Sequence, residues 1–147
     1  MSSRIVTLSE KIVGGEVAKP GAWPWTGLLG RTGLSGGRNC SFKDGFPQCI
    51  FSGMTVVCGG SLISPDTIVT AAHCFDGSSR DPTIVRLGEH DITKLDDTEE
   101  PSVDVDIDKI ITHPNWNSRT LDNDIAIVKL RSNITYTKVR KKCKLIN

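Results

Sequence analysis

His73 is the residue of this sequence best placed for acid–base chemistry. It lies in Thr70-Ala71-Ala72-His73-Cys74, so a cysteine follows it directly, and Cys58 lies sixteen positions before that cysteine. A bond between the two cysteines would join a strand to the turn that carries the imidazole. An imidazole titrates near neutral pH, so it can take up and return a proton during a reaction. The context favours a general base over the alternative, a histidine that fills space beside a disulfide.

A base of this kind activates a weak nucleophile such as a serine hydroxyl, and its second ring nitrogen needs a hydrogen-bond acceptor. Asp124 directly precedes the apolar run Ile125-Ala126-Ile127-Val128, so we expect its carboxylate at the start of a buried strand. Asp122 lies two residues earlier and would point to the same side of an extended segment. The residue pattern alone leaves both aspartates open as the partner of His73.

The five cysteines indicate an oxidising compartment. They are Cys40, Cys49, Cys58, Cys74 and Cys143, and none forms a Cys-x-x-Cys pair of the kind that binds zinc. Residues 1–11 lack the continuous apolar core of a signal peptide, so we expect that the natural precursor begins further upstream. Because the number is odd, one cysteine is expected to have its partner outside this chain.

The composition is typical of one β-rich domain. The chain has 147 residues, 14 glycines, a net charge of +1 and no apolar run long enough to span a membrane. This charge gives no reason to expect nucleic acid or a membrane as a partner. Short strand-like runs separated by turn signals predict a sandwich or a barrel. The runs occupy residues 56–63, 67–70, 83–87, 103–107 and 125–128.

Five motifs in order resemble the amino-terminal half of chymotrypsin/trypsin-like serine proteases. They are Ile12-Val13-Gly14-Gly15, Trp23-Pro24-Trp25, Cys58-Gly59-Gly60-Ser61-Leu62-Ile63, Thr70-Ala71-Ala72-His73-Cys74 and Asp122-Asn123-Asp124-Ile125-Ala126. The resemblance covers about residues 11–140. Within the family, the sequence is most similar in character to arthropod clotting and immune-cascade members. It implies an all-β fold with one six-stranded antiparallel Greek-key barrel, the second barrel of the family being missing.

The resemblance also assigns roles to residues. It implies that His73 is the base, that Asp124 is its partner, and that Cys58 and Cys74 form a disulfide. It implies activation by cleavage between Lys11 and Ile12, after which the new amino group of Ile12 pairs with a carboxylate beside the catalytic serine. The expected organisation is a remnant of an activation segment at residues 1–11, half of a protease domain at 12–135, and a truncated inter-barrel segment with a basic tail at 136–147.

Three further features are expected around this framework. Cys40 and Cys49 bracket an inserted loop, which we expect to be closed by its own disulfide. Asn39-Cys40-Ser41 and Asn133-Ile134-Thr135 match the glycosylation sequon. Cys143 falls where the family often has a cysteine that bonds to the propeptide.

An acidic loop offers a candidate calcium site. Related proteases place side-chain ligands where this chain has Glu89, Asp91, Asp96 and Glu99. Calcium prefers six to eight oxygen ligands and tolerates irregular geometry, which an acidic loop can supply. A solvated loop without an ion is the equal alternative, and no cofactor is required for the expected chemistry.

The sequence contains no Gly-Asp-Ser-Gly-Gly motif, which carries the nucleophile in this family. Ser35-Gly36-Gly37 resembles part of it, but Leu34 precedes that segment and it lies before His73, against the family's order. We therefore expect an extracellular, zymogen-type serine endopeptidase that is incomplete and inactive as given, acting on protein substrates or meeting inhibitors only if completed. The alternative is a short non-catalytic homologue that binds protease partners or inhibitors.

Overall fold

The computed structural model describes residues 15–32, 39–43, 46–51, 54–75, 77–92 and 100–144, with the backbone alone for 39–43 and 46–51. These residues form eight strands and one short 3-10 helix, η1. The strands are β1 (Thr26–Thr32), β2 (Asn39–Lys43), β3 (Phe46–Phe51), β4 (Met54–Ser64), β5 (Thr67–Thr70), β6 (Ile84–Leu87), β7 (Val103–Thr112) and β8 (Ala126–Leu130), and η1 spans Ala72–Cys74.

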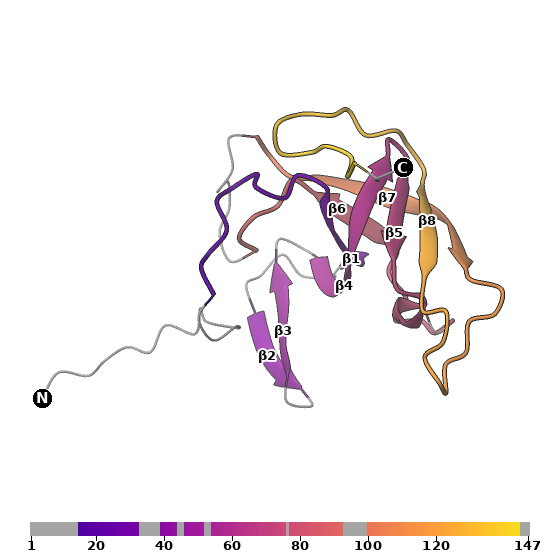
Figure 1. Ribbon diagram of the computed structural model, residues 1–147. Helices are drawn as coiled ribbons and strands as arrows, with labels where there is room; N and C mark the ends of the chain where they lie inside the picture. The colour runs from indigo at the N-terminus through magenta and orange to yellow at the C-terminus, as the bar shows by residue number, and fades with distance from the viewer. Residues whose placement is uncertain are drawn as a thin grey trace, which may run out of the picture.

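Six of the strands close into an antiparallel barrel. The order β1-β6-β7-β8-β5-β4 is completed by direct pairing of β1 with β4, so neither strand is left as an open edge. The remaining strands, β2 and β3, form a hairpin that extends the sheet beyond β4 (Figure 1). The predicted six-stranded barrel is confirmed.

The barrel interior is filled by aliphatic side chains from alternating strand positions. Leu29, Leu62, Ile68, Val85 and Val128 are all fully buried and belong to one core cluster. Each comes from a different strand, so the interior layer ties β1, β4, β5, β6 and β8 together. Burial of such side chains is the main favourable term in folding.

Arg86 is the one strongly charged residue buried among the described side chains of the barrel, at 6% exposure. Its Nε donates to Asp104 Oδ1 at 2.6 Å and its Nη2 donates to Asp104 Oδ2 at 2.8 Å. The carboxylate of Glu89 lies 3.7 Å from Nη1. The hydrogen bonds that Arg86 donates to Asp104 raise the pKa of Arg86, so the guanidinium stays charged and its burial is offset by paired carboxylates.

Gly60 allows β4 to approach its neighbours closely. A Cβ atom at this position would lie 2.6 Å from Ile68 Cγ2 and 3.0 Å from Leu29 Cδ1. The adjacent Gly59 has only the backbone oxygen of Gly27 nearby, at 3.9 Å. Of these two glycines, only Gly60 is therefore required by packing.

The segment after β8 returns across the barrel. Ile134 N donates to Pro65 O at 2.7 Å, Lys141 N donates to Pro24 O at 2.8 Å, and Cys143 N donates to Leu62 O at 2.7 Å. These backbone bonds hold residues 131–144 against the barrel even though the segment contains no strand.

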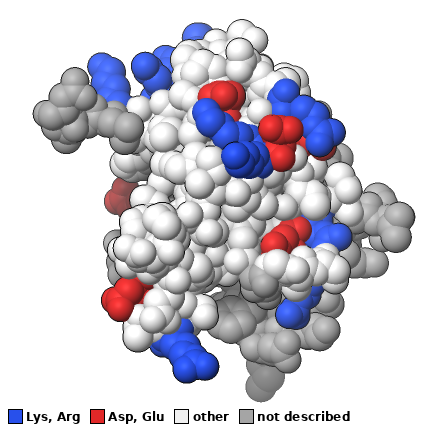
Figure 2. Space-filling view, turned by 90° about the vertical axis from the view of Figure 1, so that its right-hand side faces the viewer, with Lys and Arg blue, Asp and Glu red and all other residues white. Residues whose placement is uncertain are grey.

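The surface carries charges of both signs. Figure 2 shows basic and acidic side chains interspersed on one face, several of them as neighbours of opposite sign. In the described part of the chain, no helix has the length and apolar character needed to cross a bilayer.

Candidate functional site

His73 is held by the turn that follows β5. The backbone is extended at Ala71 and then enters η1, where Phe75 N donates to Ala72 O at 3.0 Å. The hydroxyl of Thr70 donates to Gly59 O at 2.7 Å, which joins the end of β5 to β4 just before the turn. Ala72 and Cys74 are buried on either side of His73, so the imidazole is directed outward.

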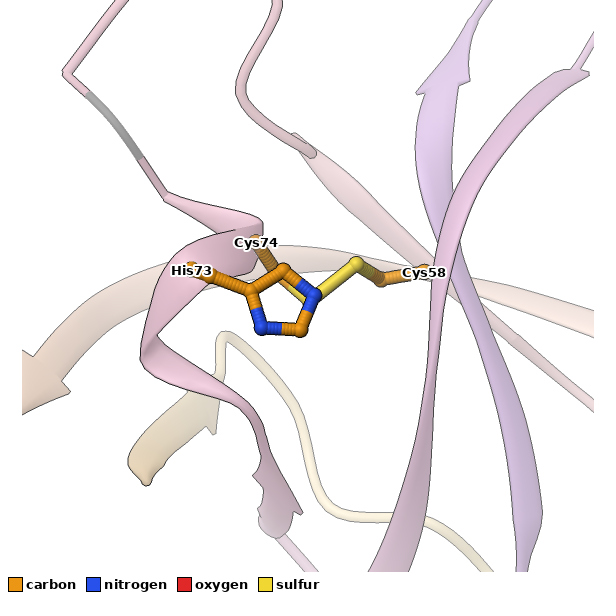
Figure 3. A group of neighbouring side chains, drawn as sticks. All are labelled: Cys58, His73 and Cys74. Atoms are coloured by element: carbon orange, nitrogen blue, oxygen red, sulfur yellow. A yellow bond between two sulfur atoms is a disulfide. The ribbon is translucent and has the colours of Figure 1, made fainter. Parts of the chain in front are cut away.

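The disulfide Cys58–Cys74 is confirmed. It joins β4 to η1 with a Cα–Cα distance of 6.1 Å, directly beside His73. Figure 3 shows the imidazole next to this bond. One ring nitrogen and the two sulfurs lie within 4.8 Å of one another, but sulfurs that are bonded to each other do not supply the thiolates that metals require. The cluster is therefore a histidine supported by a disulfide.

Asp124 reaches His73 from the start of β8. The register of β5 and β8 pairs Thr70 with Ala126, which brings the residues before β8 alongside the turn after β5. Between the two aspartates, Asn123 has a positive φ of 57°. Asparagine tolerates this left-handed conformation better than most residues, and here it breaks the extended path of the chain. As a result, Asp122 and Asp124 do not share one side.

The two oxygens of Asp124 both contact His73. Oδ2 lies 2.6 Å from Nδ1, and Oδ1 accepts the backbone N–H of His73 at 2.8 Å. An ionised carboxylate only accepts hydrogen bonds, so Nδ1 carries the proton of this bond, and in the neutral ring Nε2 then holds the lone pair. The His73 side chain is 58% exposed, so more than half of its surface is open to solvent. The arrangement can accept a proton at Nε2 and balance the resulting charge at Asp124.

The hydrogen bond from the His73 side chain lowers the pKa of Asp124, and the backbone N–H of His73 acts in the same direction. Asp124 is therefore ionised at neutral pH. Asp122 has a different partner. Its Oδ2 accepts a hydrogen bond from the hydroxyl of Thr120 at 2.6 Å. The geometry decides between the two aspartates that the residue pattern left open.

The other predicted site residues are placed less completely. Lys11, Ile12, Asp96 and Glu99 lie outside the described residues. Glu89 lies beside Arg86, as described above, and Asp91 lies near the end of a described range. The four predicted calcium ligands are therefore not tested as a group, because only Glu89 and Asp91 lie within the described residues.

The remaining cysteines are partly described. The backbones of Cys40 and Cys49 face each other directly in the β2–β3 ladder, while their side chains lie outside the described part, so their disulfide stays a prediction. Cys143 is partly exposed and forms no disulfide with the described cysteines.

Sequence reasoning missed the contribution of Thr70 and of the backbone N–H of His73. Thr70 is part of the motif, but nothing in its type signals a bond to Gly59 O. The N–H of His73 is a main-chain group, and the sequence holds no signal for its bond to Asp124.

The comparisons with known proteins point to one family. The family described as Trypsin matches residues 12–145. Phenoloxidase-activating factor 3 of Holotrichia diomphalia is 37% identical over 131 residues, which cover 82% of this chain and 33% of that protein. The CLIP domain-containing serine protease B4 of Anopheles gambiae is 33% identical, with 90% of this chain and 35% of that protein covered.

A solved structure shows the same fold. The Drosophila Grass clip serine protease of the Toll pathway matches with a TM-score of 0.66 and 30% identity, covering 92% of this chain and 36% of that one. The chain thus spans about a third of the length of these relatives. The family match, the arthropod relatives and the barrel confirm the predicted resemblance. The chain belongs to the trypsin family of serine proteases.

Proposed function

We propose that His73 is the general base of a serine-type endopeptidase and that Asp124 is the carboxylate that orients it. The observation that supports this is the 2.6 Å contact between His73 Nδ1 and Asp124 Oδ2 on an imidazole that is 58% exposed. In this reaction Nε2 takes the proton of a serine hydroxyl as the oxygen attacks a peptide carbonyl. It then returns the proton to the leaving amine, while Asp124 stabilises the imidazolium.

We propose that this chain by itself does not hydrolyse peptide bonds. The family's nucleophile lies in a Gly-Asp-Ser-Gly-Gly motif, and the sequence given contains none. The oxyanion hole and the specificity pocket also accompany that motif in the family. A base without a nucleophile and without donors for the oxyanion has no reaction to catalyse.

We propose that the protein acts outside the cell and begins as a zymogen cleaved between Lys11 and Ile12. The disulfide Cys58–Cys74 supports an oxidising compartment. The relatives include one named for activating phenoloxidase and one named as a CLIP domain protease, which supports protein substrates in a proteolytic cascade.

The acidic loop is proposed as a calcium site. Carboxylates from Glu89, Asp91, Asp96 and Glu99 are the hard oxygen donors that calcium takes, and the ion would hold the two ends of the loop together. Glu89 lies 3.7 Å from the buried guanidinium of Arg86, so its carboxylate would contact both Arg86 and the calcium ion. We expect millimolar calcium, but not magnesium, to raise the melting temperature. No shift, or an equal shift in a Glu89→Gln variant, would contradict the site.

A serine-directed fluorophosphonate probe tests the proposed catalytic role. We expect no labelling of the chain as given, and labelling of a longer translation product if the transcript continues into Gly-Asp-Ser-Gly-Gly. In that product, H73A should abolish labelling and D124N should slow turnover by about 10⁴-fold, the loss known for the corresponding aspartate of trypsin.

Asp122→Asn is the matched control, because Asp122 bonds Thr120 and not His73. An equal loss in the two asparagine variants, or labelling of the short chain, would contradict the proposal. A transcript that stops after Asn147, with a soluble product that binds proteases or inhibitors, would favour the non-catalytic homologue.

A further inference from the structure

The segment directly after β8 presents an unused acceptor for modification. Asn133-Ile134-Thr135 is a sequon with no proline at its central position. Asn133 and Thr135 are exposed, whereas Ile134 is only 7% exposed and packs in the core cluster. The backbone N–H of Ile134 donates to Pro65 O at 2.7 Å. The central residue therefore anchors the segment, and the amide and hydroxyl that the modification needs both face outward.

Asn133 lies in an irregular segment, so a bulky group attached there would not disrupt a strand. β8 ends at Leu130, and residues 131–144 contain no strand or helix. The bonds that fix the segment come from backbone groups of its neighbours: Leu130 N to Asp66 O at 2.8 Å, and Arg131 N to Asp106 O at 2.9 Å. Neither bond involves the side chain of Asn133, so a glycan on that amide displaces none of these contacts.

The sequon lies at the end of the barrel away from the candidate site. β5 and β8 are antiparallel, with Thr70 opposite Ala126 at one end and Thr67 opposite Lys129 at the other. His73 follows Thr70, and Asp124 precedes Ala126, whereas Asn133 lies beyond the Lys129 end. Figure 1 shows the chain leaving β8 at the end opposite the short helix η1. A glycan at Asn133 would leave the accessible face of His73 open to a protein substrate.

We propose that Asn133 is N-glycosylated, an inference that rests on the proposed secretion. The side-chain nitrogen of Asn133 forms a bond to the anomeric carbon of an oligosaccharide carried on a polyprenyl diphosphate. The bond from that carbon to the diphosphate oxygen breaks, and the amide loses one proton as the lipid diphosphate leaves. No electron transfer is involved. The added sugar is solubilising and enlarges the polar surface at this end of the barrel.

The second sequon is a weaker acceptor. Asn39-Cys40-Ser41 lies within β2, which is paired along its length with β3, and its central residue faces Cys49 across the ladder. An acceptor in a paired strand with a cysteine at its centre competes with strand pairing and with the predicted disulfide. We therefore expect glycosylation at Asn133 and little at Asn39.

The test is translation of the full chain behind a functional secretory leader in the presence of microsomes, scoring only the protease-protected product. We expect a mobility shift of one glycan that peptide N-glycosidase removes. N133Q and T135A should abolish it, whereas T135S, which keeps a hydroxyl, and N39Q should retain it. Asn117→Gln is the matched control, an asparagine outside any sequon.

A protected wild-type chain without a shift would overturn the proposal, as would a shift that persists in N133Q. Because the leader supplies targeting, this outcome is independent of whether His73 and Asp124 catalyse. A natural protein found inside the cell would overturn the proposed secretion and, with it, the glycosylation of Asn133 in the natural protein.

Discussion

Removing the Cys58–Cys74 disulfide tests how much the turn carrying His73 depends on it. The bond closes a chain segment with a sequence separation of 16. Cross-linking a loop of this size lowers the entropy of the unfolded chain and stabilises the fold by about 3 kcal/mol. We expect the double variant Cys58→Ala, Cys74→Ala to lose about that much free energy of unfolding. Alanine suits both sites, since it introduces no buried polar group.

Urea denaturation followed by circular dichroism measures this loss. The matched control is Cys143→Ala, which removes a cysteine that forms no disulfide with the described cysteines. The control should change the free energy of unfolding by less than about 0.5 kcal/mol, as for surface substitutions in general. A loss below about 1 kcal/mol in the double variant would refute the entropic reasoning, because the expected value rests on loop length alone.

Three further changes address packing and charge. Gly60→Ala should destabilise the fold by about 1–3 kcal/mol through overpacking, measured by urea denaturation, whereas Gly59→Ala should cost much less because its Cβ meets nothing nearer than 3.9 Å. Hydrogen bonds from two neighbouring hydroxyls and a lysine lower the pKa of Asp66 from 3.8 to about 2. Because the pKa of Asp66 is lower in the folded state, its contribution to stability is present above about pH 4 and is lost towards pH 2. Asp66→Asn should therefore reduce the fall in the free energy of unfolding between these two pH values. Asp124 has its pKa lowered mainly by the His73 side chain, so Asp124→Asn should likewise remove part of the stability lost on acidification, seen as a smaller drop in melting temperature below pH 4. An unchanged acid profile in either variant would contradict the corresponding contact.

Ordered motifs predicted the barrel and the disulfide because each motif marks a fixed place in one fold. The choice of Asp124 over Asp122 could not be made from the rule that alternate residues share a side. That rule assumes an extended chain, and the positive φ of Asn123 breaks it. The sequence does not specify that angle, because asparagine adopts it in only some contexts.

The end of β7 was also beyond sequence reasoning. Alternation of apolar and acidic residues predicted a strand at 103–107, and the structure extends it to Thr112. The pairing with β8 shifts register between Ile107 and Lys109, which changes the face that later residues present. A bulge of this kind depends on the partner strand. The alternation of apolar and polar residues therefore stops at the bulge, although the strand continues beyond it.

The contact between His73 and Asp124 joins residues 51 apart in the chain. Loop-closure entropy must be overcome before such a distant pair can meet, so contacts of this span tend to form late in folding. β8 carries the aspartate and lies between β5 and β7 in the closed barrel. A nascent or partly folded chain therefore has the imidazole but no carboxylate to orient it. The competence of the base is tied to closure of the barrel, and an incompletely folded molecule carries a histidine that is chemically ordinary.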